Sequence, residues 1–195
     1  MRNTDGMLPY PGNYGGSQKM KKKVTNNAIP SSSIIGESLG KIDYSDAYKI
    51  EIDNQNKFSI DSIASLLPSS SPKWADLLMK LRNFLVQFVG LRVENSPQTI
   101  APKNWNYKPG DSVGFFKVFK RNTHEIVFAE NDKHLNFQTA LLLEPIPGSQ
   151  KQYLYSITLV HYNNMLGRLY FFPVKPFHKL IIKALLRRMA RDINS

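Results

Sequence analysis

His178 is the residue of this sequence with the clearest chemical potential. It stands in "LGRLYFFPVKPFHKLIIKALLRRMA", between an aromatic run with two prolines and a basic, amphipathic stretch. At helical spacing it lies at the margin of an apolar side that includes Ile181. An imidazole that points into a cavity can act as a general base or orient a ligand. A packed imidazole held by one hydrogen bond, which is the commoner case, only stabilises the fold.

Arg168 is a second candidate, at the entry to the same basic stretch. Its guanidinium could bind a ligand carboxylate through two parallel hydrogen bonds at the mouth of a cavity. It could equally pair with Glu130 or Glu144 and tie the last helix to a sheet. The sequence leaves both interpretations open.

A third candidate is the string "AENDKHLNF", which contains Glu130, Asp132 and His134. In an extended segment these side chains would share a face and could ligate a metal or relay protons. The string lies at a strand junction, however, where Asn131 and Asp132 are typical of a turn. We favour the turn, in which Asp132 or His134 would hold backbone groups, and we predict no metal site.

No motif that identifies an enzyme class occurs in the sequence. It lacks G-x-S-x-G, H-E-x-x-H and Walker A patterns, and the string "GNYGG" near the start lacks the spacing of a dinucleotide site. The absence of cysteine excludes disulfides, thiolate metal sites and cysteine catalysis. We therefore predict no catalytic residue and no cofactor, with a cyclase- or hydrolase-like enzyme that uses His178 as an open alternative.

The bulk composition is that of a basic globular protein. The chain has 195 residues, 42% of them hydrophobic, and a net charge of +11. This length suits one domain, and the charge favours contact with an anionic membrane surface or, less so, nucleic acid. The sequence shows no secretory signal and no apolar run that could span a bilayer, so we expect a cytoplasmic location.

The elements that would position these side chains follow from periodicity and turn signals. Residues 1–41 are rich in Gly, Asn, Ser and Pro, which predicts a disordered or loosely attached segment before a single domain over residues 42–195. Alternation over residues 48–53 predicts a strand, and Ser59 can cap a short helix. Residues 72–90 have the pattern of an amphipathic helix.

A meander of strands and a last helix complete the expected fold. The turns "RNTH" and "IPGSQ" separate two pairs of alternating strands, and residues 94–112 read as a long loop. In the second pair of strands, Phe137 and Leu141 share one face of the first strand, and Tyr155 and Ile157 share one face of the second strand. The last helix is expected from about Pro176 onward, with its apolar side covering the sheet.

Three strings carry a resemblance to a known family: "PKWADLLMKLRNFLVQFVGL", "GDSVGFFKVFKRNTHEIVFAENDKHLNFQTALLL" and "NNMLGRLYFFPVKPFHKLIIKALLRRM". Together they resemble a bacterial family catalogued as domain of unknown function 2867, over roughly residues 42–190. The element order also looks like the α+β helix-grip fold of the START and Bet v 1-like (SRPBCC) superfamily. That resemblance implies a curved antiparallel sheet wrapped around a long C-terminal helix, with a cavity between them. Some relatives look like the same domain attached to a Rossmann domain, which implies a Rossmann-type oxidoreductase as a partner.

From this resemblance we predict that the domain binds a small apolar or lipid-like molecule between sheet and helix. The predicted ligand-binding residues are Phe115, Phe137, Leu141, Tyr155, Ile157, Arg168, Phe177, His178 and Ile181. The alternative is an interaction module that contacts anionic lipid or nucleic acid through the basic last helix. The residues of that surface would be Lys179, Lys183, Arg187, Arg188 and Arg191.

Overall fold

The protein folds around one antiparallel sheet, in a computed structural model that describes residues 23–53, 58–70, 107–113 and 116–194. Seven strands of the described chain pair in the order β1-β2-β7-β6-β5-β4-β3. The strands are β1 (Thr25–Asn26), β2 (Tyr44–Asp53), β3 (Ser112–Val113), β4 (Phe116–Arg121), β5 (Glu125–Asn131), β6 (Leu135–Pro145) and β7 (Lys151–Tyr162). The helices are α1 (Ile60–Ala64), α2 (Leu67–Ser70) and α4 (Met165–Ile193). An α+β fold with a C-terminal helix is therefore confirmed.

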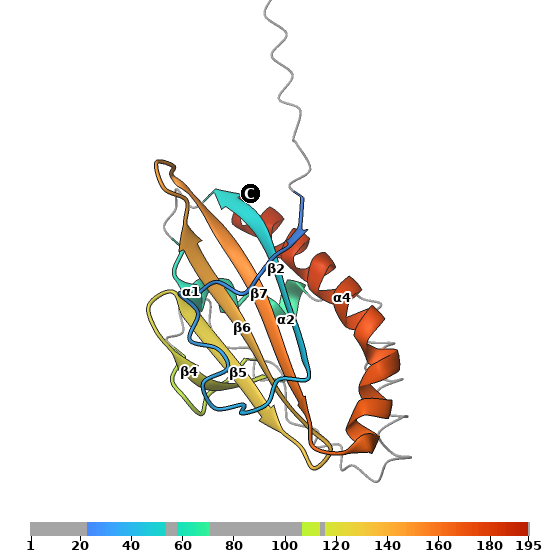
Figure 1. Ribbon diagram of the computed structural model, residues 1–195. Coiled ribbons are helices and arrows are strands. Elements are labelled where there is room, and N and C mark those ends of the chain that lie inside the picture. The colour runs from blue at the N-terminus through green and yellow to red at the C-terminus, as the bar shows by residue number, and fades with distance from the viewer. Residues whose placement is uncertain (1–22, 54–57, 71–106, 114–115, 195) are drawn as a thin grey trace, which may run out of the picture.

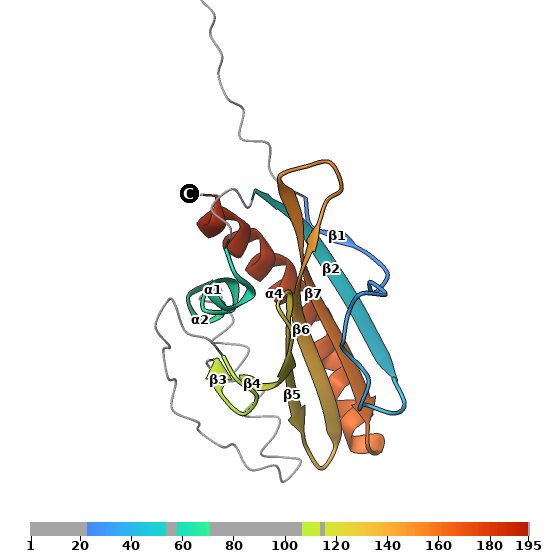
Figure 2. The same cartoon turned by 90° about the vertical axis from the view of Figure 1, so that its left-hand side faces the viewer.

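The described elements form three layers. The helices α1, α2 and α4 cover one face of the sheet, and the segment that precedes β2 crosses the other face (Figure 2). Long, curved α4 runs along the sheet near β2 and β7 (Figure 1). The side of the sheet that faces α4 is called the helix side below, and the opposite side the far side.

Several local predictions are confirmed. The turns at residues 122–124 and 146–150 connect β4 to β5 and β6 to β7. The hydroxyl oxygen of Ser59 caps α1 by accepting a hydrogen bond from the backbone N–H of Ser62 at 3.2 Å. The predicted helix over residues 72–90 and most of the predicted long loop lie outside the described residues.

The register between β6 and β7 corrects the predicted inward face. Leu141 pairs with Ser156, and Phe137 and Leu141 lie on the helix side, within apolar clusters to which α4 contributes. Tyr155 and Ile157 point to the far side, where they belong to a separate cluster. The four residues therefore do not line one surface.

The physical reason for this difference is that β7 is buried on both of its faces. Every residue from Leu154 to Val160 is buried. Alternation in such a strand does not show which set of side chains faces the helix. A register shift of one residue exchanges the two sets, and the turn between β6 and β7 decides the register.

The last helix begins earlier than predicted, at Met165 instead of about Pro176. Asn164 caps it, because its side-chain oxygen accepts a hydrogen bond from the N–H of Gly167 at 3.1 Å. Pro173 and Pro176 lie inside the helix, both exposed on its outer side. A proline removes one helical hydrogen bond and bends the helix away from its ring. Here that bend curves α4 toward the sheet (Figure 1).

Residues 23–41 differ from the prediction of a loosely attached segment. Strand β1 pairs with β2, and the segment after it packs on the far side of the sheet. The carboxylate of Glu125, which is fully buried, accepts hydrogen bonds from the Ser33 hydroxyl at 2.6 Å and from the Ile34 N–H at 2.7 Å. Single polar contacts of this kind hold the segment without any sequence period, so pattern analysis does not detect them.

Glu125 should make stability depend on pH in a defined direction. Burial is the largest influence on this carboxyl, and it raises the pKa above the ordinary value of 4.5. A raised pKa in the folded state adds stability below pH 4.5, and that stability is lost as pH rises through the folded pKa. Relative to Glu125→Gln, the wild-type free energy of unfolding should therefore fall as the pH rises above 4.5.

Urea unfolding at a series of pH values checks this expectation. The exposed Glu37, replaced by glutamine, is the matched control for the removal of one carboxylate. A difference between wild type and Glu125→Gln that stays constant with pH would contradict the prediction.

Candidate functional site

Two apolar clusters lie between the sheet and α4, one along each half of the helix. The larger cluster surrounds Leu186 and Met189 in the second half of α4 and includes Tyr48 of β2. The smaller cluster surrounds Phe171 in the first half and includes Tyr44 of β2. On β2, β7 and β6, the residues of this face that lie between the two clusters are polar, and together with His178 they form the candidate site.

A row of polar side chains crosses three neighbouring strands at this boundary. Asp46 of β2 pairs with Thr158 of β7, and Thr158 pairs with Thr139 of β6. In β2, Asp46 stands between the two clustered tyrosines, so by the two-residue period of a strand it faces α4. These three residues are called the polar row below. His178 of α4 lies over it, with Nε2 3.5 Å from Oδ2 of Asp46.

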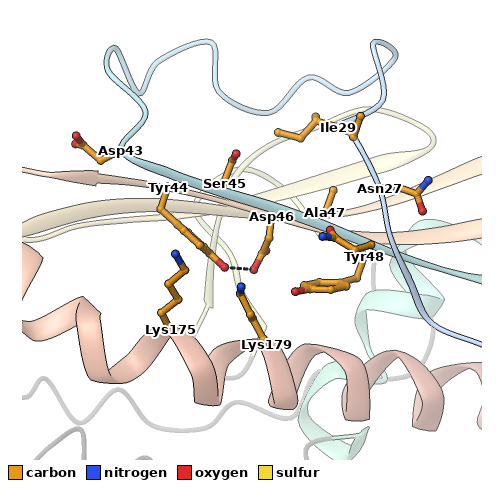
Figure 3. Close-up of a pocket in the computed structure, with 12 residues that line it drawn as sticks. Asn27, Ile29, Asp43, Tyr44, Ser45, Asp46, Ala47, Tyr48, Lys175 and Lys179 are labelled. Atoms are coloured by element: carbon orange, nitrogen blue, oxygen red, sulfur yellow. Dashed lines mark hydrogen bonds between the residues drawn. The ribbon is translucent and has the colours of Figure 1, made fainter.

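Asp46 is a buried acidic group with an incomplete set of hydrogen bonds. Its side chain is 5% exposed. The Tyr44 hydroxyl donates a hydrogen bond to Oδ2, shown as the dashed line in Figure 3. Burial and this hydrogen bond raise the pKa of Tyr44 far above its ordinary value, so the phenol keeps its proton and remains a donor.

Three buried polar atoms converge at this place without a hydrogen-bond partner among the described residues. They are Oδ1 of Asp46, Oγ1 of Thr158 and Nε2 of His178. Buried polar groups are nearly always hydrogen-bonded, and each exception needs an explanation such as a ligand or a bound water. In contrast, the Thr139 hydroxyl is satisfied, because it donates to the Ile157 carbonyl at 3.0 Å. The three atoms without hydrogen-bond partners therefore lie between β2, β7 and α4.

An open cleft of about 540 Å³ reaches Tyr44 and Asp46 from the edge of β2. Lys175 and Lys179 rise from α4 toward these two residues (Figure 3). The Lys175 ammonium lies 4.9 Å from the centre of the Tyr44 ring, a cation–π distance. The other lining residues are Asn26, Asn27, Ala28, Ile29, Asp43, Ser45, Ala47 and Tyr48. The cleft is thus lined by a carboxylate, that of Asp46, and by the side chains of two lysines.

Asp43, on the rim of the cleft, belongs to a separate and complete network. Its carboxylate accepts from the Tyr162 N–H at 2.9 Å and pairs with Lys41 at 3.0 Å and with His161 at 2.9 Å. The backbone hydrogen bond and the neighbouring Lys41 lower the pKa of Asp43 to about 2. This carboxylate is therefore fully occupied, unlike that of Asp46.

The sequence analysis did not identify Asp46, although a signal for it exists. In β2, every second residue from Tyr44 to Ile52 is buried, and Asp46 occupies one of these inward positions. A charged residue at a buried position of an alternating strand is uncommon unless it is paired. Thr158 carries no comparable signal, because threonine is frequent in strands.

The predicted ligand-binding residues are only partly brought together. His178 lies at the site, and Phe137 and Leu141 belong to the apolar clusters on either side of it. On α4, Ile181 is half-buried and Phe177 is 40% exposed. Tyr155 and Ile157 lie on the far side of the sheet. Phe115 lies outside the described residues.

Arg168 is placed away from this site. It is exposed in the first turn of α4, with its guanidinium carbon 5.9 Å from the centre of the Tyr162 ring. Along the helix it stands about 15 Å from His178. The ion pairs formed by the described residues do not join Arg168 to Glu130 or Glu144.

The string "AENDKHLNF" forms a turn with a structural role, as predicted. Asp132 accepts a hydrogen bond from the N–H of His134 at 3.2 Å. The buried His134 ring lies 3.1 Å from the side-chain oxygen of Asn164, the residue that caps α4. Among the described residues, no group of three or more His, Asp or Glu side chains could hold a metal ion. The turn therefore anchors the start of the last helix.

Comparisons with known proteins give one match, to a family model. No curated protein and no solved structure matches this chain significantly. None of the helices in the described ranges is long and apolar enough to cross a membrane. One family model matches residues 38–185, a range that contains both Asp46 and His178. The chain therefore belongs to the family described as protein of unknown function (DUF2867).

Proposed function

We propose that this domain binds a small organic acid that carries a hydroxyl or amino group, at the boundary between β2 and α4. The observation that carries the proposal is the buried carboxylate of Asp46, whose Oδ1 has no hydrogen-bond partner among the described residues. A ligand hydroxyl or ammonium would donate to this oxygen. An anionic group on the same molecule would meet Lys175 and Lys179, which line the same cleft.

The arrangement of sheet and helix supports the helix-grip interpretation, in which a ligand lies between a curved sheet and the last helix. Side chains of two apolar clusters occupy the described space there, on either side of the polar row. This filling favours a small polar ligand at the polar row over a lipid-like molecule along the helix. The proposal therefore keeps the predicted location and changes the predicted chemistry.

The test is a binding screen with amino acids and small hydroxy acids, using thermal shift followed by titration calorimetry. At least one compound should bind the wild type, and Asp46→Asn should weaken its binding. A hydrogen bond to a charged group contributes about 1.5–3 kcal/mol, which corresponds to roughly tenfold to a hundredfold in affinity. Asparagine keeps an oxygen for the Tyr44 hydroxyl, so the variant should remain folded.

Asp53→Asn is the matched control, because Asp53 lies at the other end of β2 and also has a buried oxygen without a partner among the described residues. It should bind like the wild type. The proposal would be wrong if no amino or hydroxy acid binds, or if both variants weaken binding equally.

A second candidate function is acid–base catalysis by the same cluster. The observation in its favour is the 3.5 Å distance between Nε2 of His178 and the Asp46 carboxylate. An imidazole beside a carboxylate can accept a proton from a bound hydroxyl. Nuclear magnetic resonance spectra of a bound compound, recorded over hours, separate the two functions, because a binding protein leaves the compound unchanged.

A further inference from the structure

The outer face of the first half of α4 is unusually apolar for a surface. Large hydrophobic side chains on this part of the helix are strongly exposed, namely Met165 at 73%, Leu169 at 70%, Phe172 at 79% and Leu180 at 57%. Their spacing of four, three and eight residues places them on one side of a helix. This set is called the apolar strip below.

The inner side of the same helical segment is also apolar. Phe171 is 6% exposed and packs between the rings of Tyr44 and Tyr162, at 4.9 Å and 5.7 Å. The first half of α4 is thus hydrophobic on both sides, although the sheet covers only one. A helix that is apolar on two opposite sides can bury only one of them against the sheet. An exposed patch of this kind marks an interaction surface.

Cationic residues continue the same outer face beyond the apolar strip. Arg187 and Arg191 follow Leu180 at seven and eleven residues, spacings that keep them on its side of the helix, and both are exposed. Arg168 is exposed within the strip. The chain as a whole carries a net charge of +11. The outer face therefore consists of an apolar half followed by a cationic half.

We propose that this face docks on an anionic phospholipid bilayer. Leu169 and Phe172 would insert among the headgroups, and the arginines would contact lipid phosphates. This combination of leucine and phenylalanine with arginine is what holds an amphipathic helix in the plane of a membrane interface. Nucleic acid would complement the arginines but leave the apolar strip in water. The anionic bilayer alone among these partners complements both halves.

Sedimentation with vesicles tests the proposal on the full chain. Vesicles of equimolar phosphatidylcholine and phosphatidylglycerol should bind the wild type, and vesicles of phosphatidylcholine alone should bind it much less. The double variant Leu169→Ser with Phe172→Ser should lose tenfold or more of the binding. Both side chains are exposed, so the variant should keep the wild-type circular dichroism spectrum.

Two further variants make the test specific. Phe119→Ser removes an exposed aromatic ring from β4, far from the strip in the sequence, and should bind vesicles like the wild type. Arg187→Glu with Arg191→Glu should weaken binding to the anionic vesicles and shift its salt dependence. The proposal is overturned if the wild type does not bind anionic vesicles, or if the serine double variant binds them equally well. It is also overturned if the serine substitutions only convert a dimer to a monomer in analytical ultracentrifugation.

Discussion

Replacing Gly167 by alanine should destabilise the protein by about 3 kcal/mol or more, because the added methyl group has no room. A Cβ atom at this position would lie 2.0 Å from the carbonyl oxygen of His134 and 2.8 Å from its carbonyl carbon. Both are backbone atoms of the turn that holds the start of α4. The clash of the added methyl group can be relieved only if the helix and the turn move apart. That movement would disrupt the Asn164 cap and the contact between Asn164 and His134.

Gly148→Ala is the matched control for this substitution. Gly148 has a φ of +70° in the turn between β6 and β7, and nothing lies within 4 Å of its would-be Cβ. The left-handed conformation alone should cost about 1–2 kcal/mol. Chemical unfolding followed by circular dichroism measures both variants. Equal losses at the two positions would show that the close approach at Gly167 is not a determinant of stability.

The second large effect is expected at Arg121, whose guanidinium joins β4 to α1 and to Tyr107, which precedes β3 in the chain. It donates to Asp61 Oδ2 at 2.8 Å and to the carbonyl of Tyr107 at 2.7 Å. The N–H of Tyr107 in turn donates to Asp61 at 3.0 Å. The side chains of Arg121 and Asp61 are only 20% and 14% exposed. Arg121→Ala would leave a largely buried carboxylate without its cation, at a cost of about 3 kcal/mol.

Lys151→Ala provides the comparison with an exposed ion pair. Lys151 and Glu51 pair at 2.7 Å across β7 and β2, with exposed fractions of 48% and 38%. Exposed pairs of this kind contribute little to stability, because water screens both charges. Urea unfolding at neutral pH should therefore rank Arg121→Ala well below Lys151→Ala in stability. Similar losses would mean that burial does not strengthen the Arg121 contact.

The sequence by itself determined those parts of the fold that depend on neighbouring residues. Turn residues located the β4–β5 and β6–β7 hairpins, Ser59 marked the start of α1, and alternation from Tyr48 to Asp53 identified β2. These signals are local, because a cap or a turn depends on the backbone chemistry of a few adjacent residues. The motif of residues 166–178 also carried the family resemblance, which the match over residues 38–185 confirms.

Only the tertiary structure decided how these elements face one another. The prolines of α4 suggested a late start for the helix, but a cap at Asn164 and contacts with the sheet outweigh two lost hydrogen bonds. The direction of the Tyr155 side chain depends on the β6–β7 register, which alternation cannot show in a strand that is buried on both faces.

The tertiary structure also decides which residues form the candidate site. Asp46, Thr158 and His178 come from distant parts of the sequence, and no spacing rule connects them. They meet because β2 pairs with β7 in one register and because α4 packs on the sheet with His178 3.5 Å from Asp46. Strand pairing and helix packing are set by burial between residues that are distant in sequence, and not by neighbouring residues. A single sequence therefore shows that these residues are present but not that they lie together.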